Sequence, residues 1–344
     1  MPPADQNHAE NMLLRLLCYG PAKVKKTWWA LNAAKAGFNV LLLDGDGGSQ
    51  IISQIEKQYI SNINIIDIVD KQNMPVMCEF ITRFLTGNPF IWNETQKDIL
   101  LIAAHAKAEH SYYIIDTSKL THNDVVIIDS WDALTWSLAW RWYKENGLKV
   151  EAAEHAKTSD KLWPGYRWSG AMASWALKQI KALSNNCHVI VVGHQSVYEK
   201  RHDEIINGKT KQIIDWSRMQ VKSTSGPHGM ELAQAFTDIP YFGVNGSRFT
   251  IDTRVEKDRD GGCRVIPPGI YRWEDLQFGD IIEMAGIKRP DPEAELEAAI
   301  WYPSGADLPE GKVITQGNEG KPLEAKDAKP SGFAGLLAPK SGGS

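Results

Sequence analysis

A glycine, several lysines and a threonine stand close together near the start of the chain, between an apolar segment and a helix-forming one. The segment Gly20-Pro21-Ala22-Lys23-Val24-Lys25-Lys26-Thr27 matches the pattern G-x-x-x-x-G-K-[ST] at Gly20, Lys26 and Thr27. Such a loop binds phosphate through backbone N–H groups, a lysine ammonium and the positive end of a helix. The eight residues therefore predict a phosphate-binding loop, in which Lys26 reaches the β- and γ-phosphates and Thr27 ligates Mg²⁺.

Lys25 stands at the sixth position of this loop, where the pattern has glycine. Glycine lets the backbone turn tightly and bring its N–H groups to the phosphates, so Lys25 requires an unfavourable φ or a different loop path. Its ammonium either adds a second cation to the site or disrupts the loop conformation that binds phosphate. The alternative to a phosphate site is a lysine-rich turn between a strand and a helix, with no ligand.

Two other apolar segments run into acidic residues. Val125–Ile128 leads to Asp129, as in a buried strand that presents a carboxylate beside a phosphate loop to hold Mg²⁺ through water. Leu41–Leu43 leads to Asp44 and Asp46 among glycines, where one carboxylate could orient an attacking water as a general base. The structural alternatives are an N-cap for the helix after Asp129 and a flexible acidic turn at Asp44 and Asp46.

A fourth apolar segment, Val189–Val192, ends in Gly193, His194 and Gln195. A glutamine in this place could sense the γ-phosphate and pull on the segment that follows. For His194 the alternative is an ordinary strand-end histidine with its hydrogen bonds satisfied.

The elements that must position these residues alternate between short apolar, β-branched segments and helical patterns. This alternation predicts an α/β fold with a mainly parallel central sheet flanked by helices. Residues 196–230 are polar and lack sustained periodicity, which predicts a functional loop. Segments 242–255 and 269–272 alternate around turn residues and should add antiparallel strands at one edge. The predicted parallel strands are 13–19, 40–43, 63–69, 125–128 and 189–192, and the predicted helices are 27–36, 74–85, 95–108, 133–144 and 169–183.

Composition sets further bounds. The net charge is −4, so contact with nucleic acid requires local patches. Four widely spaced cysteines favour neither a zinc cluster nor a disulfide framework, and no apolar segment is long enough to span a bilayer, so a cytoplasmic protein without a membrane partner is expected. We expect a disordered N-terminus over residues 1–10, an ATPase core over 11–287 and a disordered tail rich in Pro, Gly, Ala and Lys over 288–344.

In their order along the chain, these segments resemble the RecA core, particularly the short RecA-like ATPases that bacteriophages use in single-strand annealing and recombination. The resemblance covers about residues 10–255 and rests on four segments, namely Tyr19–Thr27 with Leu31–Ala34, Val40–Asp44, Val126–Ser130 with Ala133-Leu134, and Val192–Gln195.

The resemblance implies ATP and Mg²⁺ as cofactors and gives each matching residue a role. Lys26 and Thr27 would bind phosphate and Mg²⁺, Asp129 would be the Walker B acid, and Gln195 would be the γ-phosphate sensor. Asp46 falls where the family has its catalytic glutamate, one methylene longer. The departures at Lys25 and Asp46 put the rate of hydrolysis in doubt. The segment before Leu13 is also too short for the N-terminal polymerisation domain of RecA.

RecA-like proteins touch single-stranded DNA with two loops, which would fall here near residues 144–168 and 196–231. Aromatic and basic residues in both have suitable chemistry, because bases stack on aromatic rings and phosphates attract cations. The candidate DNA-binding residues are Trp163, Arg167 and Trp168 in the first loop, and Lys200, Arg201, Lys209, Lys211, Arg218 and Lys222 in the second. Trp136 and Trp140, at helical spacing, are assigned to the core or to a subunit contact.

The resemblance further implies a homo-oligomer, a ring or a filament, with nucleotide at the subunit interface, and a single-strand-binding protein as a further partner. Lys257 and Arg259 are candidates for a residue that completes a neighbour's site. Two other readings stay open. One is a degenerate, non-catalytic DNA-binding or scaffold protein that has lost its loop glycine. The other is a helicase motor of the DnaB type.

Overall fold

The computed structural model describes residues 12–68, 70, 75–88, 90–93, 99–103, 112–147, 163–206, 209–222, 234–256, 261–291 and 300–301. These residues lie in the first of two units, Met1–Pro303, and the second unit, Ser304–Ser344, falls outside them. Most of the predicted tail, 288–344, therefore lies outside the described residues. None of the described helices is long and apolar enough to cross a membrane.

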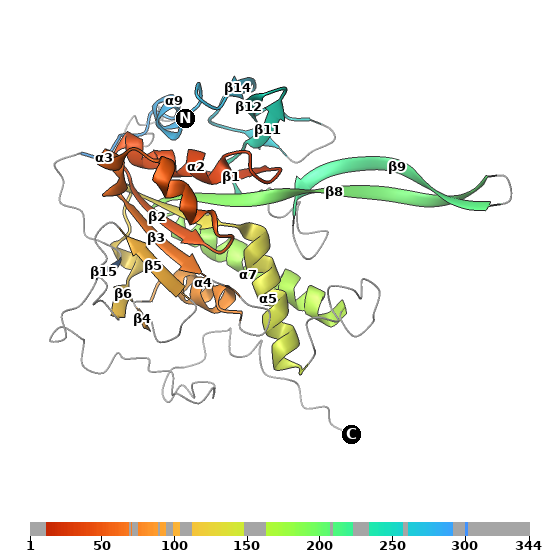
Figure 1. Ribbon diagram of the computed structural model, residues 1–344, viewed down its shortest axis with the longest axis horizontal. Coiled ribbons are helices and arrows are strands. Elements are labelled where there is room, and N and C mark those ends of the chain that lie inside the picture. The colour runs from red at the N-terminus through yellow and green to blue at the C-terminus, as the bar shows by residue number, and fades with distance from the viewer. Residues whose placement is uncertain are drawn as a thin grey trace, which may run out of the picture. The chain divides into compact units, whose positions relative to one another are not determined.

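Five parallel strands form the centre of a larger mixed sheet, in the spatial order β1-β8-β7-β2-β3 (Figure 1). The apolar, β-branched segments become strands because each is buried on both faces of the sheet. This mixed α/β architecture with a mainly parallel central sheet confirms the predicted fold class. The central strands are β1 (Arg15–Gly20), β2 (Asn39–Asp44), β3 (Ile63–Ile68), β7 (Asp124–Asp129) and the first part of β8 (His188–Ile206).

Antiparallel strands extend the sheet beyond β1, as predicted from the turn residues at Asn245 and Gly246. β11 (Tyr241–Asn245) pairs in parallel with β1, and β12 (Arg248–Asp252) and β14 (Ile270–Arg272) continue it in antiparallel fashion. β5 (Ile99–Ala103) pairs antiparallel with β3 at the far edge. The remaining short strands are β10 (Asp238–Ile239), β13 (Gly262–Cys263), β4 (Phe90–Asn93), β6 (Tyr112–Ile115) and β15 (Ile300–Trp301), the last three forming a separate small sheet.

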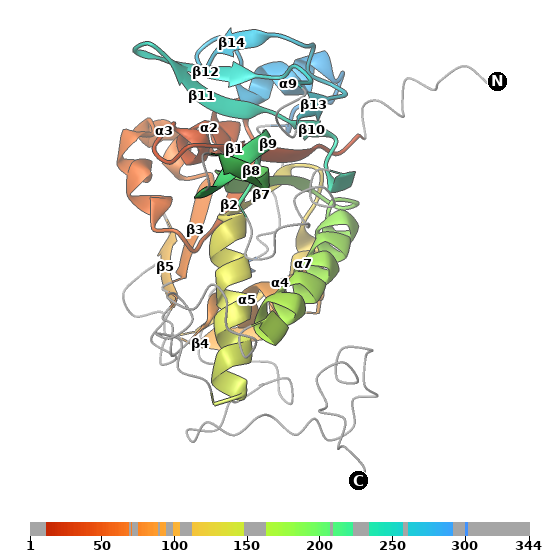
Figure 2. The same ribbon diagram turned by 90° about the vertical axis from the view of Figure 1, so that its right-hand side faces the viewer.

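Helices cover both faces of the central sheet (Figure 2). On one face, α2 (Lys26–Leu31), the 3-10 segment η1 (Asn32–Ala36) and α9 (Phe278–Met284) enclose a core with side chains of the central strands. On the other face lie α4 (Met77–Leu85), α5 (Trp131–Glu145) and α7 (Trp163–Leu183). Three short elements complete the set, namely η2 (Gly48–Gln54), α3 (Lys57–Ile60) and η4 (Thr117–Lys119).

Two predicted elements are wrong. The predicted helix 95–108 contains the strand β5, and its other residues lie outside the described part of the chain. The predicted loop 196–230 is largely a two-stranded ribbon, in which β8 continues to Ile206 and pairs antiparallel with β9 (Lys209–Val221) (Figure 1). The strands of this ribbon satisfy each other's backbone groups, and the sequence of the ribbon lacks the alternation of apolar and polar residues by which strands are recognised.

His188 links the start of β8 to the core and supplies a pH-dependent term in stability. Its Nδ1 accepts a hydrogen bond from the Leu14 backbone N–H at 3.0 Å, and its ring packs edge-on against Phe38 and Phe278. Burial lowers the pKa of His188 to about 4, from an ordinary value of 6.5. Because the unfolded chain takes up a proton more readily than the folded one, the contribution of His188 is complete above pH 6.5 and is lost as the pH falls towards 4.

We therefore expect the pH profile of stability to change in His188→Gln. Between pH 7 and pH 4 the wild type should lose about 3 kcal/mol more of its free energy of unfolding than the variant does. Urea titrations at several pH values measure this difference. His202→Gln, at an exposed position on β8, is the control. Parallel profiles for wild type and His188→Gln would contradict the assignment.

Candidate functional site: a phosphate loop beside two strand ends

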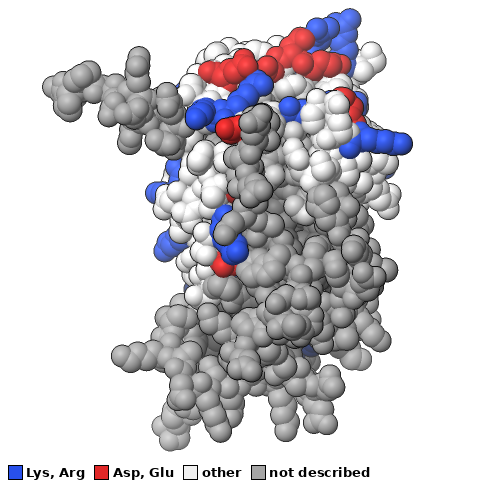
Figure 3. All heavy atoms as spheres, turned by 90° about the vertical axis from the view of Figure 1, so that its left-hand side faces the viewer, with Lys and Arg blue, Asp and Glu red and all other residues white. Residues whose placement is uncertain are grey.

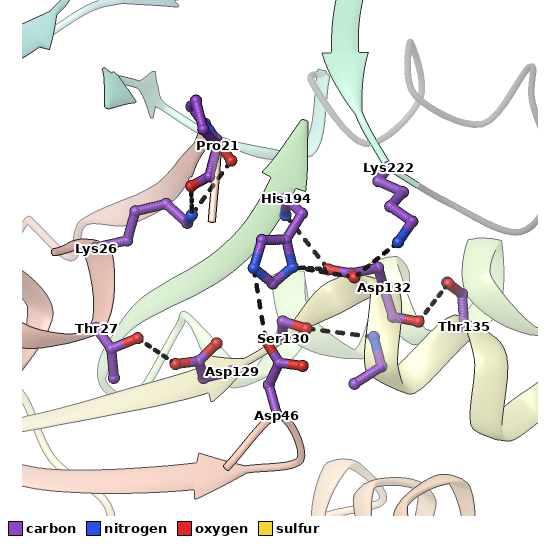
Figure 4. Close-up of polar contacts among 12 residues, drawn as sticks. Pro21, Lys26, Thr27, Asp46, Asp129, Ser130, Asp132, Thr135, His194 and Lys222 are labelled. Carbon is purple, nitrogen blue, oxygen red and sulfur yellow. Dashed lines mark hydrogen bonds and ion pairs between the residues drawn. The ribbon is translucent and has the colours of Figure 1, made fainter. Parts of the chain in front are cut away.

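The loop after β1 closes tightly over the start of α2. Gly20 ends β1 with φ +155°, and a Cβ added there would stand 2.0 Å from the Phe242 carbonyl oxygen on β11. α2 begins at Lys26, the position predicted to open the helix. The Lys26 ammonium donates to the carbonyl oxygens of Gly20, at 3.2 Å, and of Pro21, at 2.6 Å (Figure 4). The loop thus surrounds its own lysine, in the place where a phosphate group would compete for that cation.

Lys25 has the unfavourable backbone conformation that its position in the pattern requires. Its φ is 65°, and Lys23 has φ 63°, both in the left-handed region. For a residue with a side chain this region costs about 1–2 kcal/mol. The Lys25 ammonium lies over aromatic rings, 4.4 Å from the centroid of Trp273. It contacts rings outside the loop, whereas Lys26 contacts the loop's own carbonyls.

Thr27 and Asp129 come together from the loop and from the end of β7. The Thr27 hydroxyl donates to Asp129 Oδ2 at 2.5 Å, although β8 lies between β1 and β7 in the sheet (Figure 4). Burial raises the pKa of Asp129 to about 7, the hydrogen bond from Thr27 opposes that shift, and the carboxylates of Asp44 and Asp46 add to it. A nearby cation would favour the ionised form of a carboxyl group that is buried beside other negative charges.

The oxygen atoms at this point fit a magnesium ion. Hydroxyl and carboxylate oxygens are the donors that Mg²⁺ prefers. Gly48 lies next to both oxygen atoms. A Cβ added to it would stand 3.2 Å from Asp129 Oδ2 and 3.4 Å from Thr27 Oγ1. A larger residue at this position would crowd these two oxygen atoms, which glycine avoids.

Ser130, and not Asp129, caps the helix that follows β7. The Ser130 hydroxyl accepts a hydrogen bond from the Ala133 backbone N–H at 3.3 Å. The alternative that Asp129 serves only as the N-cap of α5 is therefore wrong. Its carboxylate is instead turned towards Thr27 and the phosphate loop.

Asp46 and His194 meet on the other side of Asp129. His194 Nε2 lies 3.5 Å from Asp46 Oδ2, and His194 Nδ1 lies 3.0 Å from both carboxylate oxygens of Asp132 (Figure 4). The hydrogen bond that the His194 ring donates to Asp132 raises the pKa of His194, against the effect of burial. Burial raises the pKa of Asp46, whereas the neighbouring His194 lowers it. His194 therefore lies between two carboxylates. The alternative of an ordinary histidine with its hydrogen bonds satisfied describes Nδ1, which bonds to Asp132, but not Nε2, which faces Asp46.

The sequence did not single out Asp132 for the site. It lies in the first turn of α5, where its Oδ1 also accepts from the His194 backbone N–H at 3.3 Å, and Lys222 Nζ lies 3.8 Å from its Oδ2. Burial alone would raise the pKa of Asp132, but the hydrogen bond and charge of His194 lower it. The only signal in the sequence is its spacing of three residues from Asp129, which does not reveal the partner on β8.

Gln195 follows His194 at the base of the ribbon. Its Oε1 accepts a hydrogen bond from the Tyr241 hydroxyl at 2.8 Å, and its backbone pairs with Val221 of β9. The structure therefore brings Lys26, Thr27, Asp46, Asp129 and His194 into one site, and it ties Gln195 to β11 at the edge of that site.

The residues expected to touch DNA occupy helix and ribbon positions. Trp163 begins α7, where Arg167 is exposed and Trp168 half-buried, so this segment is helical and not a loop. The remaining part of that predicted loop, 148–162, lies outside the described residues, as do Lys257 and Arg259. On the ribbon, Arg201 pairs with Glu199, and the register sets Lys200 opposite Trp216 and Arg218 opposite Tyr198. Lys209 and Lys211 lie on β9, and Lys222 follows it beside Asp132.

Figure 3 shows the charges of the described residues on the side of the molecule turned away from the ribbon. The described lysines and arginines on this side lie among aspartates and glutamates, with both signs of charge side by side. Surface pairs of this type include Arg254 with Asp252 and Arg272 with Asp275. A mixed surface attracts a phosphate backbone only weakly.

Comparisons with known proteins give one family match and one similar solved structure. A family model described as AAA domain matches residues 12–230, which include the Gly20–Thr27 loop, Asp129 and the whole of the ribbon. This chain is also similar to a crystal structure of the RadB recombinase, with 14% sequence identity and a TM-score of 0.35. The alignment covers 81% of this chain and 91% of the RadB chain. No curated protein matches. Since the family model matches more than half of the chain, the chain belongs to the AAA domain family of P-loop ATPases.

Proposed function

We propose that the protein binds and hydrolyses MgATP and couples this reaction to single-stranded DNA in recombination, annealing or replication. The observation that carries the nucleotide site is the hydrogen bond between Thr27 and Asp129 beside the buried Lys26. An ammonium, a hydroxyl and a carboxylate in this arrangement are the groups with which P-loop proteins bind a nucleoside triphosphate and its magnesium ion.

In this proposal each residue acts through a contact that it already makes or can exchange. Lys26 would exchange the carbonyls of Gly20 and Pro21 for phosphate oxygens, and Thr27 and Asp129 would hold Mg²⁺, which neutralises charge on the phosphates. Asp46 would accept a proton from the attacking water. His194 would position Asp46 while Asp132 holds the imidazole.

Gln195 is proposed as the γ-phosphate sensor because of its place in the chain. It lies where β8 leaves the sheet and becomes the ribbon, and it bonds to Tyr241 on β11. Lys222, at the other strand of the same ribbon, lies near Asp132. A change of contacts at the phosphates would thus act directly on both strands at the base of the ribbon.

The ribbon is the proposed DNA-binding element. Its register sets basic residues opposite aromatic ones, with Lys200 opposite Trp216 and Arg218 opposite Tyr198. Cations for the phosphates and rings for the bases are the features of single-strand binding, with stacking worth about 1–3 kcal/mol per base. The resemblance to RecA-like proteins is the basis for three further parts of the proposal. They are a role in phage DNA metabolism, a homo-oligomer with nucleotide between subunits, and a single-strand-binding protein as partner.

The test is the rate of ATP hydrolysis by the purified protein, with and without single-stranded DNA, beside the variant Lys26→Ala. We expect DNA to stimulate hydrolysis and Lys26→Ala to abolish it. DNA binding without turnover in any condition would favour the degenerate scaffold instead. A forked-duplex assay separates the DnaB-type motor, because only that motor should unwind the fork.

A further inference from the structure

Lys25 departs from the phosphate-loop pattern, yet the loop around it is closed. Its backbone is left-handed, with φ 65° and ψ 20°, and its carbonyl accepts the hydrogen bond from Trp29 N–H, at 2.9 Å, in the first turn of α2. A glycine would take this conformation without steric cost. A lysine in its place requires a compensating interaction, because the conformation is unfavourable for a residue with a side chain.

Three aromatic rings provide that interaction. The Lys25 ammonium lies 4.4 Å from the ring centroid of Trp273, 4.9 Å from that of Phe249 and 5.6 Å from that of Trp28. All three distances are within the range of a cation–π contact, which gains strength where water is partly excluded. Lys25 and the three rings are each half-buried. We call Trp28, Phe249 and Trp273 the ring cage.

The ring cage is assembled from separate parts of the fold. Trp28 lies on α2, Phe249 on β12, and Trp273 directly after β14. The Trp273 backbone N–H donates to the Phe249 carbonyl at 3.3 Å, and the Trp273 ring meets Trp28 edge-on, with centroids 4.5 Å apart. Two walls of the cage therefore belong to the antiparallel edge of the sheet, and Lys25 connects the phosphate loop to that edge.

A neighbouring lysine shows what an ordinary surface lysine does here. Lys35 also lies over Trp28, at 5.6 Å, but it forms an ion pair with Glu56 at 2.6 Å. Among the described residues, no carboxylate lies within ion-pair distance of Lys25, and its contacts are with the three rings. The cage is thus the environment that fixes the Lys25 side chain.

We propose that Lys25 is a positioning residue that holds the phosphate loop closed for ATP through the ring cage, in place of the conformational freedom that glycine gives. This inference rests on the proposed function, because it concerns binding at the same site. The Lys25 ammonium anchors the loop at the sheet edge, and the neighbouring Lys26 is left to meet the phosphates. The loop therefore tolerates lysine at this position only while the cage is present.

The test is the affinity for the non-hydrolysable analogue adenylyl imidodiphosphate with Mg²⁺, measured by calorimetry on the full chain. Lys25→Met keeps an unbranched side chain only one atom shorter and keeps the backbone strain, but it removes the charge, and we expect about tenfold weaker binding. Lys25→Arg keeps a cation for the rings and should bind within about threefold of wild type. The control Lys35→Met, over the same Trp28 ring but outside the loop, should bind as wild type does.

A double-mutant cycle separates anchoring from a general loss of structure. Trp273→Leu should weaken binding about as much as Lys25→Met, whereas in a Lys25→Gly background it should have no further effect. Lys25→Gly alone should stay within about threefold of wild type, because glycine takes the left-handed conformation freely. Thermal unfolding of each variant shows whether it is folded.

Three results would overturn the inference while leaving the proposed function intact. The first is that Lys25→Met binds the analogue as tightly as wild type does. The second is that Lys25→Arg binds it as weakly as Lys25→Met does. The third is that Trp273→Leu weakens binding equally in wild type and in the Lys25→Gly background. Wild-type protein that binds no nucleotide at all would overturn the proposed function, and the inference with it.

Discussion

Replacing Asp46 by asparagine is expected to lower the rate constant of ATP hydrolysis by about 10²–10⁴-fold without changing the dissociation constant for ATP. Asparagine keeps the size of the side chain and an oxygen near His194 Nε2, but it cannot take a proton from water. The phosphate contacts proposed for Lys26 and the oxygen pair of Thr27 and Asp129 do not involve the Asp46 side chain. Steady-state hydrolysis and calorimetric binding measure the two effects separately.

The control for this experiment is Asp46→Glu. Glutamate restores the length found in RecA-like proteins, so this variant should hydrolyse ATP at least as fast as wild type. An Asp46→Asn protein with the wild-type rate would remove Asp46 from the proposed mechanism. Loss of activity in both variants would indicate that Asp46 acts through its contact with His194 and not as a base.

The pH dependence of hydrolysis gives a second measure of the same residue. A general base works in its deprotonated form, so the rate should rise as the pH passes upwards through the pKa of Asp46. Burial and the carboxylates of Asp132 and Asp44 raise that pKa, whereas His194 and Lys26 lower it. Without the positive charge of His194, in His194→Asn, the rising limb should move to higher pH.

Much of the site could be predicted because its residues follow apolar segments directly. Parallel strands bring their carboxyl ends to one edge of a sheet, so Asp44, Asp46 and Asp129 were placed near the Gly20–Thr27 loop by chain order alone. The segments that become β1, β2, β3, β7 and the start of β8 are buried on both faces. Their continuous hydrophobicity is therefore visible in the sequence.

Contacts that depend on tertiary packing could not be predicted. Asp132 looks like an ordinary acidic residue in the first turn of a helix, and only the packing of α5 beside β8 brings it to His194. The ring cage joins residues more than 200 positions apart, so nothing local to Lys25 indicates it. The β8–β9 ribbon was missed because most of its residues whose burial is described are exposed or half-buried, which removes the apolar periodicity.

Gly20→Ala is the second substitution for which we expect a large effect. A Cβ at Gly20 would stand 2.0 Å from the Phe242 carbonyl oxygen and 3.0 Å from its carbonyl carbon, so β1 and β11 cannot keep their spacing. The neighbouring Tyr19 N–H donates to the Pro240 carbonyl at 3.3 Å, and this bond would be strained as well. We expect the free energy of unfolding to fall by about 3 kcal/mol or more.

The same change should damage the nucleotide site, because Gly20 begins the phosphate loop and its carbonyl contacts Lys26. A displacement of about 1 Å in the loop can lower kcat/KM by about 10²-fold.

Gly37→Ala is the matched control for Gly20→Ala. Gly37 also has a positive φ, +92°, but a Cβ there would meet nothing within 4 Å, so this variant carries only the conformational cost of about 1–2 kcal/mol. Urea unfolding and ATP hydrolysis of the two variants isolate the steric clash at Gly20. Equal losses of stability in both, with hydrolysis intact in Gly20→Ala, would mean that β1 and β11 can separate at this point without disturbing the loop.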